Sequence, residues 1–148
     1  MHRTLRILLA VLGVAALLIA LSNLFLGPTL TAWTAEQAFD TVTGHQGPLT
    51  PPWPPTMDNE LRFYSALWGA YGILLLATAR DLDTRLRLVP WLAVVFFAGG
   101  LGRAISWTQV GAPHPLFLSL MAIELILPPI FMLLYACVVR TRTMAKSK

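Results

Sequence analysis

Charged side chains are scarce in this chain of 148 residues. Only 12% of the residues are Asp, Glu, Lys or Arg, whereas 56% are hydrophobic, and soluble domains carry roughly 25% charged residues. So few charges cannot cover a water-soluble surface, and the mean hydropathy of +0.65 is typical of a protein surrounded by lipid. Because each membrane span uses about 20 residues, we expect one compact membrane domain over residues 1–148.

Residues that build cofactor and metal sites are also few. Cys137 is the only cysteine, which excludes an intrachain disulfide. The three histidines, His2, His45 and His114, lack the sequence spacing of a metal site. The chain shows no nucleophile with a base, no phosphate-binding glycine loop and no haem motif. The sequence therefore gives no reason to expect a cofactor or a metal.

What the chain does have is a series of long apolar runs. Four of them, at about residues 7–26, 61–79, 88–108 and 115–139, are each long enough to cross a bilayer as a helix. The first run is longer than the core of a signal peptide and lacks a clear cleavage site after it, so a retained anchor is favoured over a cleaved leader. The predicted fold class is all-α, an integral membrane four-helix bundle.

The basic residues sit beside these runs and indicate how the protein is oriented. A net charge of +4 does not indicate nucleic acid as a partner, because the basic residues do not form a face with interleaved aromatics. The first and third connections carry neither Lys nor Arg, which places them outside by the positive-inside rule. We therefore expect a multi-pass protein of the bacterial cytoplasmic (inner) membrane with both termini in the cytoplasm. Nine of the eleven Lys and Arg residues lie on the predicted inner side: Arg3, Arg6, Arg80, Arg85, Arg87, Arg140, Arg142, Lys146 and Lys148.

The first outer connection, residues 28–57, is the longest segment outside the predicted spans. Its first half is predicted to hold a short surface helix, since Thr34 and Gln37 have the spacing of a capping box. Its second half is expected to be stiff and non-helical. Such a connection either covers the outer face as a lid or simply joins two spans. The prolines of the second half are Pro48, Pro51, Pro52, Pro54 and Pro55.

Ionisable side chains inside the predicted spans are the main functional signal. They are costly in lipid, so each needs a partner. Arg103 and Glu124 lie in the outer parts of consecutive spans, where an arginine side chain reaches a neighbouring helix. We predict that they form a pair within a polar cluster, which is either a ligand site or a structural ion pair that holds the bundle together. The predicted cluster comprises Asn59, Glu60, Arg62, Arg103, Ser106 and Glu124.

Small residues and prolines accompany these polar groups. In the third span, Gly99, Gly102 and Ser106 share a helical face with Arg103. Ser65, Gly69 and Gly72 form a similar stripe with Arg62, which permits close helix packing. In the fourth span, Pro128 and Pro129 predict a kink, because they leave the carbonyls of Glu124 and Leu125 without N–H partners.

Taken together, these segments resemble the domain-of-unknown-function 4345 family over nearly the whole chain. The resemblance implies a small four-helix bacterial membrane protein but supplies no reaction. A looser likeness to DoxX-like four-helix membrane proteins also concerns the architecture alone. The matching positions are Asn59-Glu60-Leu61-Arg62-Phe63, Gly69, Gly72, Gly99-Gly100-Leu101-Gly102-Arg103, Ser106, Gly111, Pro113, Glu124 and Pro128.

Three functions are compatible with these patterns. The leading hypothesis is a non-catalytic protein that binds a small amphiphile, a lipid, quinone or isoprenoid, at the polar cluster. The second is an assembly or stabilising subunit of a larger membrane complex, with a membrane protein or a second copy of the chain as partner. The third, a membrane isomerase, would use Glu124 as its proton-transferring group. Membrane lipids are expected partners in all three cases.

Overall fold

The chain is helical over most of its length in the computed structural model, which describes residues 1–146. Lys148, the last basic residue of the predicted tail, lies outside the described residues. Within residues 1–146 there is no β-strand, so the predicted all-α class is confirmed. In chain order the elements are α1 (His2–Phe25), α2 (Pro28–Thr43), α3 (Pro55–Arg80), α4 (Leu82–Arg85), the 3-10 helix η1 (Leu86–Leu88), α5 (Val89–Val110) and α6 (Pro115–Lys146).

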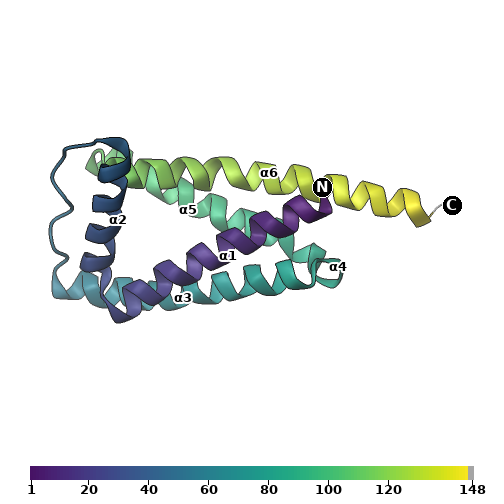
Figure 1. Cartoon of the computed structure of the whole chain (residues 1–148), viewed down its shortest axis with the longest axis horizontal. Coiled ribbons are helices and arrows are strands. Elements are labelled where there is room, and N and C mark those ends of the chain that lie inside the picture. The colour runs from purple at the N-terminus through teal and green to yellow at the C-terminus, as the bar shows by residue number, and fades with distance from the viewer. Residues whose placement is uncertain (147–148) are drawn as a thin grey trace.

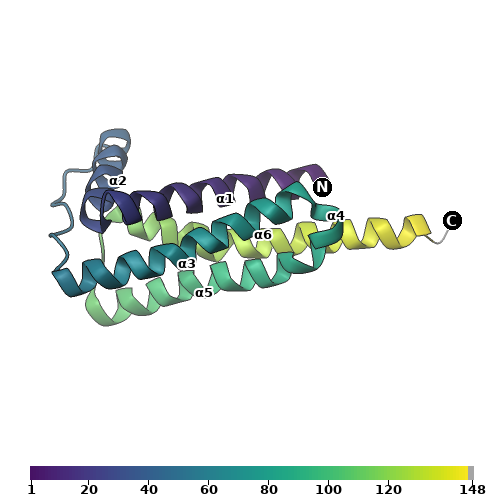
Figure 2. The ribbon, with the colours of Figure 1, turned by 90° about the horizontal axis from the view of Figure 1, so that it is seen from below.

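The long helices are arranged as two packed pairs. Helix α1 packs along α3, and α5 packs along α6. Both termini lie toward the end of the molecule that holds α4, while α2 crosses the opposite end (Figures 1 and 2). Helix α2 contacts α1, α3 and α6 there. We call these two ends the α4 end and the α2 end.

Three helical segments are long and apolar enough to cross a membrane. They are His2–Phe25, Leu82–Val110 and Pro115–Met144, and they correspond to three of the four runs predicted from the sequence. Helix α3 contains the remaining run and has 26 residues, which is sufficient length. It does not reach the same apolar composition, because Asp58, Glu60 and Arg62 all lie near its start.

Buried apolar residues form one core in the half of the molecule nearer the α4 end. They come from the first parts of α1 and α5, from α4 and η1, and from the last parts of α3 and α6. Within this core Tyr71 stacks on Phe96, and its hydroxyl donates to the carbonyl oxygen of Leu92 at 2.8 Å. The bond satisfies a polar group that would be costly to bury alone. The core consists of Leu5, Leu9, Tyr71, Leu75, Ala79, Leu82, Leu86, Val89, Leu92, Ala93, Phe96, Phe131 and Val138.

The outer surface of the long helices is apolar as well. Val11 on α1, Ile73 on α3, Trp91 on α5 and Leu133 on α6 are each more than 60% exposed. Water-soluble monomers rarely expose apolar surface over so many elements. Burial in lipid accounts for it, as expected for a membrane protein.

The α4 end is closed by polar contacts between helices distant in sequence. Asp83 pairs with His2 at 3.3 Å and with Arg142, whose Nη1 also donates to the Asp83 carbonyl oxygen at 3.1 Å. Arg6 donates from Nη2 to the carbonyl oxygen of Arg80 at 3.3 Å. These contacts join the start of α1, the α3–α4 junction and the end of α6.

The turn into α4 has its own cap. The Asp81 carboxylate accepts a hydrogen bond from the Thr84 hydroxyl and another from the Thr84 backbone N–H at 3.4 Å. Hydrogen bonding from the Thr84 side chain lowers the pKa of Asp81 below its ordinary value. The carboxylate form is therefore favoured where α3 turns into α4.

A short helix was predicted in the first half of residues 28–57, and α2 confirms that a helix is present, but its start was predicted wrongly. Thr34 is not a cap: its hydroxyl donates to the carbonyl of Leu30 inside the helix at 2.9 Å. The helix begins at Pro28, directly after Gly27, whose φ of 95° is accessible to glycine. It ends at Thr43 and is followed by Gly44, which adopts the left-handed conformation with φ 73°.

Residues 44–54, with four of the five prolines, have no regular structure, as predicted, whereas Pro55 was wrongly placed in this segment, because it begins α3. The segment is tied back onto α2. Trp33 donates from its indole nitrogen to the carbonyl of Thr50 at 2.6 Å. The Glu36 carboxylate, which is fully buried, accepts from the backbone N–H of Thr50 at 2.8 Å and from its hydroxyl. The connection between α1 and α3 therefore consists of α2 and an irregular strap, residues 44–54, that packs against it.

Candidate functional site

The predicted ion pair between α5 and α6 is formed. Arg103 Nε lies 2.7 Å from Glu124 Oε2. Glu124 is 6% exposed, so its carboxylate is almost completely removed from lipid and solvent. A charged hydrogen bond of this length compensates part of the cost of burying the carboxylate.

A glycine on α5 makes this close approach possible. A Cβ atom at Gly100 would lie 2.9 Å from Leu125 Cδ2 and 3.0 Å from Glu124 Cβ. Both distances are shorter than ordinary carbon contacts. The absence of a side chain at position 100 therefore brings the backbone of α5 against the turn of α6 that carries Glu124.

The guanidinium of Arg103 is only partly satisfied by Glu124. Its Nε–H is used, and no residue within 1–146 accepts a hydrogen bond from Nη1 or Nη2. The side chain is 39% exposed, and its carbon Cζ lies 5.9 Å from the ring centre of Phe117. A guanidinium has five N–H donors, so four of them have no hydrogen-bond partner in the described chain.

The face of α5 that carries small residues beside Arg103 is not covered by another helix of the described chain. A Cβ at Gly102 would meet nothing within 4 Å, and one at Gly99 would lie 3.9 Å from Glu124 Oε2. Ser106, one turn further along, is exposed. The described part of the chain leaves this face uncovered, so an external group can approach the guanidinium along it.

The corresponding stripe on α3 is used for packing within the protein. A Cβ at Gly72 would lie 3.0 Å from the carbonyl oxygen of Gly13, and one at Gly69 would lie 3.4 Å from Ala20 Cβ. Ser65 is buried and donates to the carbonyl of Leu61 at 2.6 Å. The α3 stripe is therefore covered by α1, unlike the stripe on α5.

Arg62 is engaged elsewhere at the α2 end. Its Nε lies 2.7 Å from Asp58 Oδ2, one turn earlier on α3, and its Nη1 donates to the Leu24 carbonyl oxygen at 2.6 Å. A Cβ at Gly27 would lie 2.8 Å from Nη2. Arg62 thus satisfies an unpaired carbonyl at the end of α1, and no described contact joins it to Arg103 or Glu124.

The other predicted cluster members do not join the ion pair. Asn59 and Glu60 are exposed at the start of α3, and no side chain in the described chain pairs with either. The structure brings Arg103 and Glu124 together, keeps Ser106 on the adjoining open face, and places Asn59, Glu60 and Arg62 on the other helix pair.

Helix α6 continues through Pro128 and Pro129 from Pro115 to Lys146. Pro128 is buried and Pro129 is exposed. Because proline has no N–H, the carbonyls of Glu124 and Leu125 have no partner in the next turn. These two acceptors lie at the same level as the buried carboxylate, and the predicted bend at this level remains a prediction.

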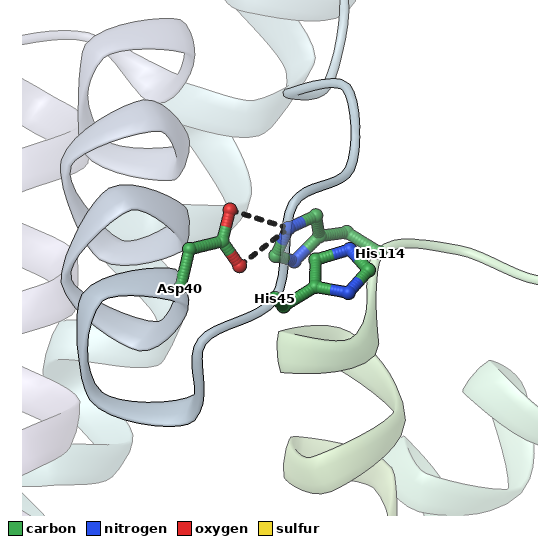
Figure 3. Close-up of side chains that lie close together, drawn as sticks. All are labelled: Asp40, His45 and His114. Carbon is green, nitrogen blue, oxygen red and sulfur yellow. Dashed lines mark hydrogen bonds and ion pairs between the residues drawn. The ribbon is translucent and has the colours of Figure 1, made fainter.

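A second group of polar side chains meets at the α2 end, and the sequence spacing did not indicate it. Asp40 on α2, His45 just after α2 and His114 just before α6 converge (Figure 3). His114 Nε2 lies 3.2 Å from Asp40 Oδ1 and 3.4 Å from Oδ2. The rings of His45 and His114 meet edge to face with centres 5.2 Å apart.

His114 is also fixed on its other side. Its Nδ1 accepts a hydrogen bond from the backbone N–H of Leu116 at 3.3 Å. Its carbonyl oxygen accepts one from the backbone N–H of Phe117 at 2.9 Å. The residue therefore caps the start of α6 while its ring reaches α2. His114 directly before Pro115 was a usable sequence signal for such a cap, whereas nothing in the sequence pointed to Asp40.

Comparison with known proteins identifies the family. No curated protein and no solved structure matches the chain. A family model described as Domain of unknown function (DUF4345) matches residues 4–135. This range includes nearly all of α1, all of α2 to α5 and most of α6, with both polar groups described above. The chain therefore belongs to the DUF4345 family, as its sequence resemblance indicated.

Proposed function

We propose that the protein crosses the bacterial inner membrane four times, with both termini in the cytoplasm, and binds a small amphiphile in the outer leaflet through Arg103. The amphiphile is a lipid, quinone or isoprenoid whose head group accepts hydrogen bonds. The observation that carries this proposal is the set of unused N–H donors on a partly exposed guanidinium beside an uncovered helical face.

The apolar exterior of α3 supports its assignment as a fourth span. Phe63, Leu67 and Ile73 are each more than half exposed, and α3 packs along α1. A helix of this length that packs alongside α1 and has an apolar outer face is best accommodated in the bilayer. An even number of spans also agrees with both termini lying toward the α4 end (Figure 1).

Hydrogen-bond satisfaction in lipid supports the binding role of Arg103. Hydrocarbon offers no acceptors, so donors that the protein leaves unpaired are paired with head groups, water or a ligand. An amphiphile supplies an acceptor for the guanidinium and an apolar tail for the neighbouring surface. Gly99 and Gly102 leave room for such a tail beside the charge.

Thermal unfolding in detergent, with and without a total lipid extract, tests the proposal. We expect the extract to raise the unfolding temperature of the wild type and to have much less effect on Arg103→Lys. Lysine keeps the positive charge but not the planar set of donors. Arg87→Lys, at an exposed position on the predicted inner side, is the matched control. The extract is expected to raise its unfolding temperature as much as that of the wild type. An equal response of Arg103→Lys and the wild type would refute binding at this position.

A second candidate function is supported by the same open face of α5. Gly99, Gly102 and Ser106 have the small-residue spacing that lets two membrane helices approach closely. The face is covered by nothing in the described chain. A partner helix could therefore pack there, and the protein would serve as an assembly or stabilising subunit.

Replacement of Gly102 separates the two candidates. Since a Cβ at this position meets open space, Gly102→Leu is expected to leave the fold intact while blocking close helix approach. If the face is an interface, the wild type purified in mild detergent should carry a stoichiometric partner or form a dimer. The Gly102→Leu variant should do neither. Recovery of monomer alone from both proteins would exclude the assembly role.

A further inference from the structure

Asp40, His45 and His114 have the chemistry and the spacing of a metal site. One ligand atom from each residue lies within 4.8 Å of the other two. Neighbouring ligands of tetrahedral zinc are about 3.3 Å apart, given metal–nitrogen bonds of roughly 2.0 Å. His114 Nε2 and Asp40 Oδ1 already lie at 3.2 Å, so only the third ligand has to move closer. We propose that these three side chains bind a divalent transition-metal ion, with Zn²⁺ as the ion that suits them best.

The donor set favours zinc over the alkaline-earth ions. Two imidazoles and one carboxylate suit zinc and its neighbours in the first transition series, whereas Ca²⁺ and Mg²⁺ prefer an all-oxygen shell. Three protein ligands leave the fourth tetrahedral position to water. The site lies at the α2 end, which is the predicted outer surface.

One ligand atom is buried without a hydrogen bond. Asp40 Oδ1 is inaccessible, and its contact with His114 lacks hydrogen-bond geometry. The His114 side chain is 3% exposed. A buried carboxylate oxygen without a donor is costly, and a cation between the carboxylate and the ring would satisfy it. This orphaned oxygen is an observation independent of the clustering itself.

The backbone around His45 permits the third ligand to approach. Gly44 turns the chain at the end of α2 with a φ of 73°. A Cβ at Gly47 would lie only 2.3 Å from His45 Nε2, so the ring folds over a position where any side chain would collide with it. His45 is on the strap rather than in a helix, and a small movement of this segment brings a ring nitrogen to the ion.

Metal binding requires one rearrangement of a proton. In the structure Nδ1 of His114 accepts from Leu116, so the ring proton lies on Nε2, toward Asp40. When Nε2 binds the ion, that proton moves to Nδ1, and the ring gives up its 3.3 Å contact with Leu116. The contact is long for a hydrogen bond, so its loss opposes binding only weakly. The bound ion would then hold α2, the strap and the start of α6 together.

Zinc titration of the metal-free protein tests this inference. The protein is purified with a tag that contains no histidine, stripped with EDTA, and titrated with ZnCl₂ by calorimetry in detergent. We expect one Zn²⁺ per chain and a higher unfolding temperature when it binds. Because changes to outer-shell groups cost roughly 10- to 100-fold in metal affinity, loss of a ligand in His45→Gln should weaken binding at least that much.

His2→Gln is the matched control, because His2 is the remaining histidine and lies at the α4 end. It is expected to bind Zn²⁺ like the wild type. His45 carries the test because its side chain makes ring contacts but no described hydrogen bond, so its replacement should leave the fold intact. Absence of zinc binding by the wild type, unchanged affinity of His45→Gln, or an equal loss in His2→Gln would each overturn the proposal. The proposed metal site and the amphiphile site at Arg103 have no residue in common, so the failure of one proposal would leave the other untouched.

Discussion

At the scale of single residues, the Arg103–Glu124 pair is held in an unequal environment. Glu124 is almost fully buried, whereas the Arg103 side chain is 39% exposed. Removing the arginine leaves a carboxylate in a low-dielectric interior without a counter-charge. Removing the carboxylate leaves a guanidinium that can turn toward head groups or water. The two single replacements therefore do not have the same cost.

We predict that Arg103→Leu lowers the free energy of unfolding by about 2–3 kcal/mol, somewhat less than the loss of a fully buried partner. Glu124→Leu should cost less. The double replacement should recover most of the loss, because neither charge then remains. Unfolding of the four proteins in the same detergent measures the coupling between the two positions. Additive losses in the double variant would show that the pair makes no coupled contribution.

Sequence reasoning reached this pair because lipid restricts the possibilities so strongly. An acid and a guanidinium at similar depth on consecutive spans have few partners other than each other. The same reasoning did not find the partner of Arg62, because a backbone carbonyl at the end of α1 carries no sequence signature. It also missed Asp40 with His45 and His114, since one helix position and two connection residues from distant parts of the chain have no shared periodicity.

At the scale of elements, a single glycine sets the distance between α5 and α6. A Cβ at Gly100 would overlap Leu125 and Glu124, whereas a Cβ at Gly102, on the same helix, would meet open space. We predict that Gly100→Ala destabilises the protein by about 1–3 kcal/mol through overpacking. Gly102→Ala should be neutral or stabilising by up to about 1 kcal/mol, because alanine favours the helix. Thermal or denaturant unfolding of both variants checks this contrast, and equal effects would contradict it.

The limits of the elements were predictable to different degrees. The predicted spans 88–108 and 115–139 begin within one residue of α5, which starts at Val89, and of α6, which starts at Pro115. Helix α3 begins at Pro55, before its apolar run, because a proline can open a helix whose first turns are polar. The start of α2 was missed because the capping pattern at Thr34 was preferred over the Gly27-Pro28 break. Hydropathy alone does not distinguish a surface helix from a connection.

At the scale of the whole molecule, apolar burial and polar groups are segregated. The buried core lies toward the α4 end, while the ion pair, the strap and the histidine cluster lie toward the α2 end. With the proposed four spans and cytoplasmic termini, the tightest packing would lie near the cytoplasm and the two polar groups near the outer surface. A sequence shows the order of these groups along the chain, but their segregation appears only once the helices are paired.

The orientation depends on whether α3 crosses the bilayer, since α3 is the long helix with the weakest apolar composition. Cys137 is the only native cysteine, so Cys137→Ala gives a background for new labelling positions. Gln46 on the strap and Thr84 in α4 are both exposed and lie on opposite sides of α3 in the chain. We predict that a membrane-impermeant maleimide labels Gln46→Cys in intact spheroplasts but labels Thr84→Cys only after the membrane is permeabilised. Equal labelling of both positions would show that α3 does not span. Labelling of Thr84→Cys in intact spheroplasts, with Gln46→Cys labelled only after permeabilisation, would place both termini outside. The positive-inside rule predicts the first result, because Arg80, Arg85 and Arg87 flank the second position while the strap carries no Lys or Arg.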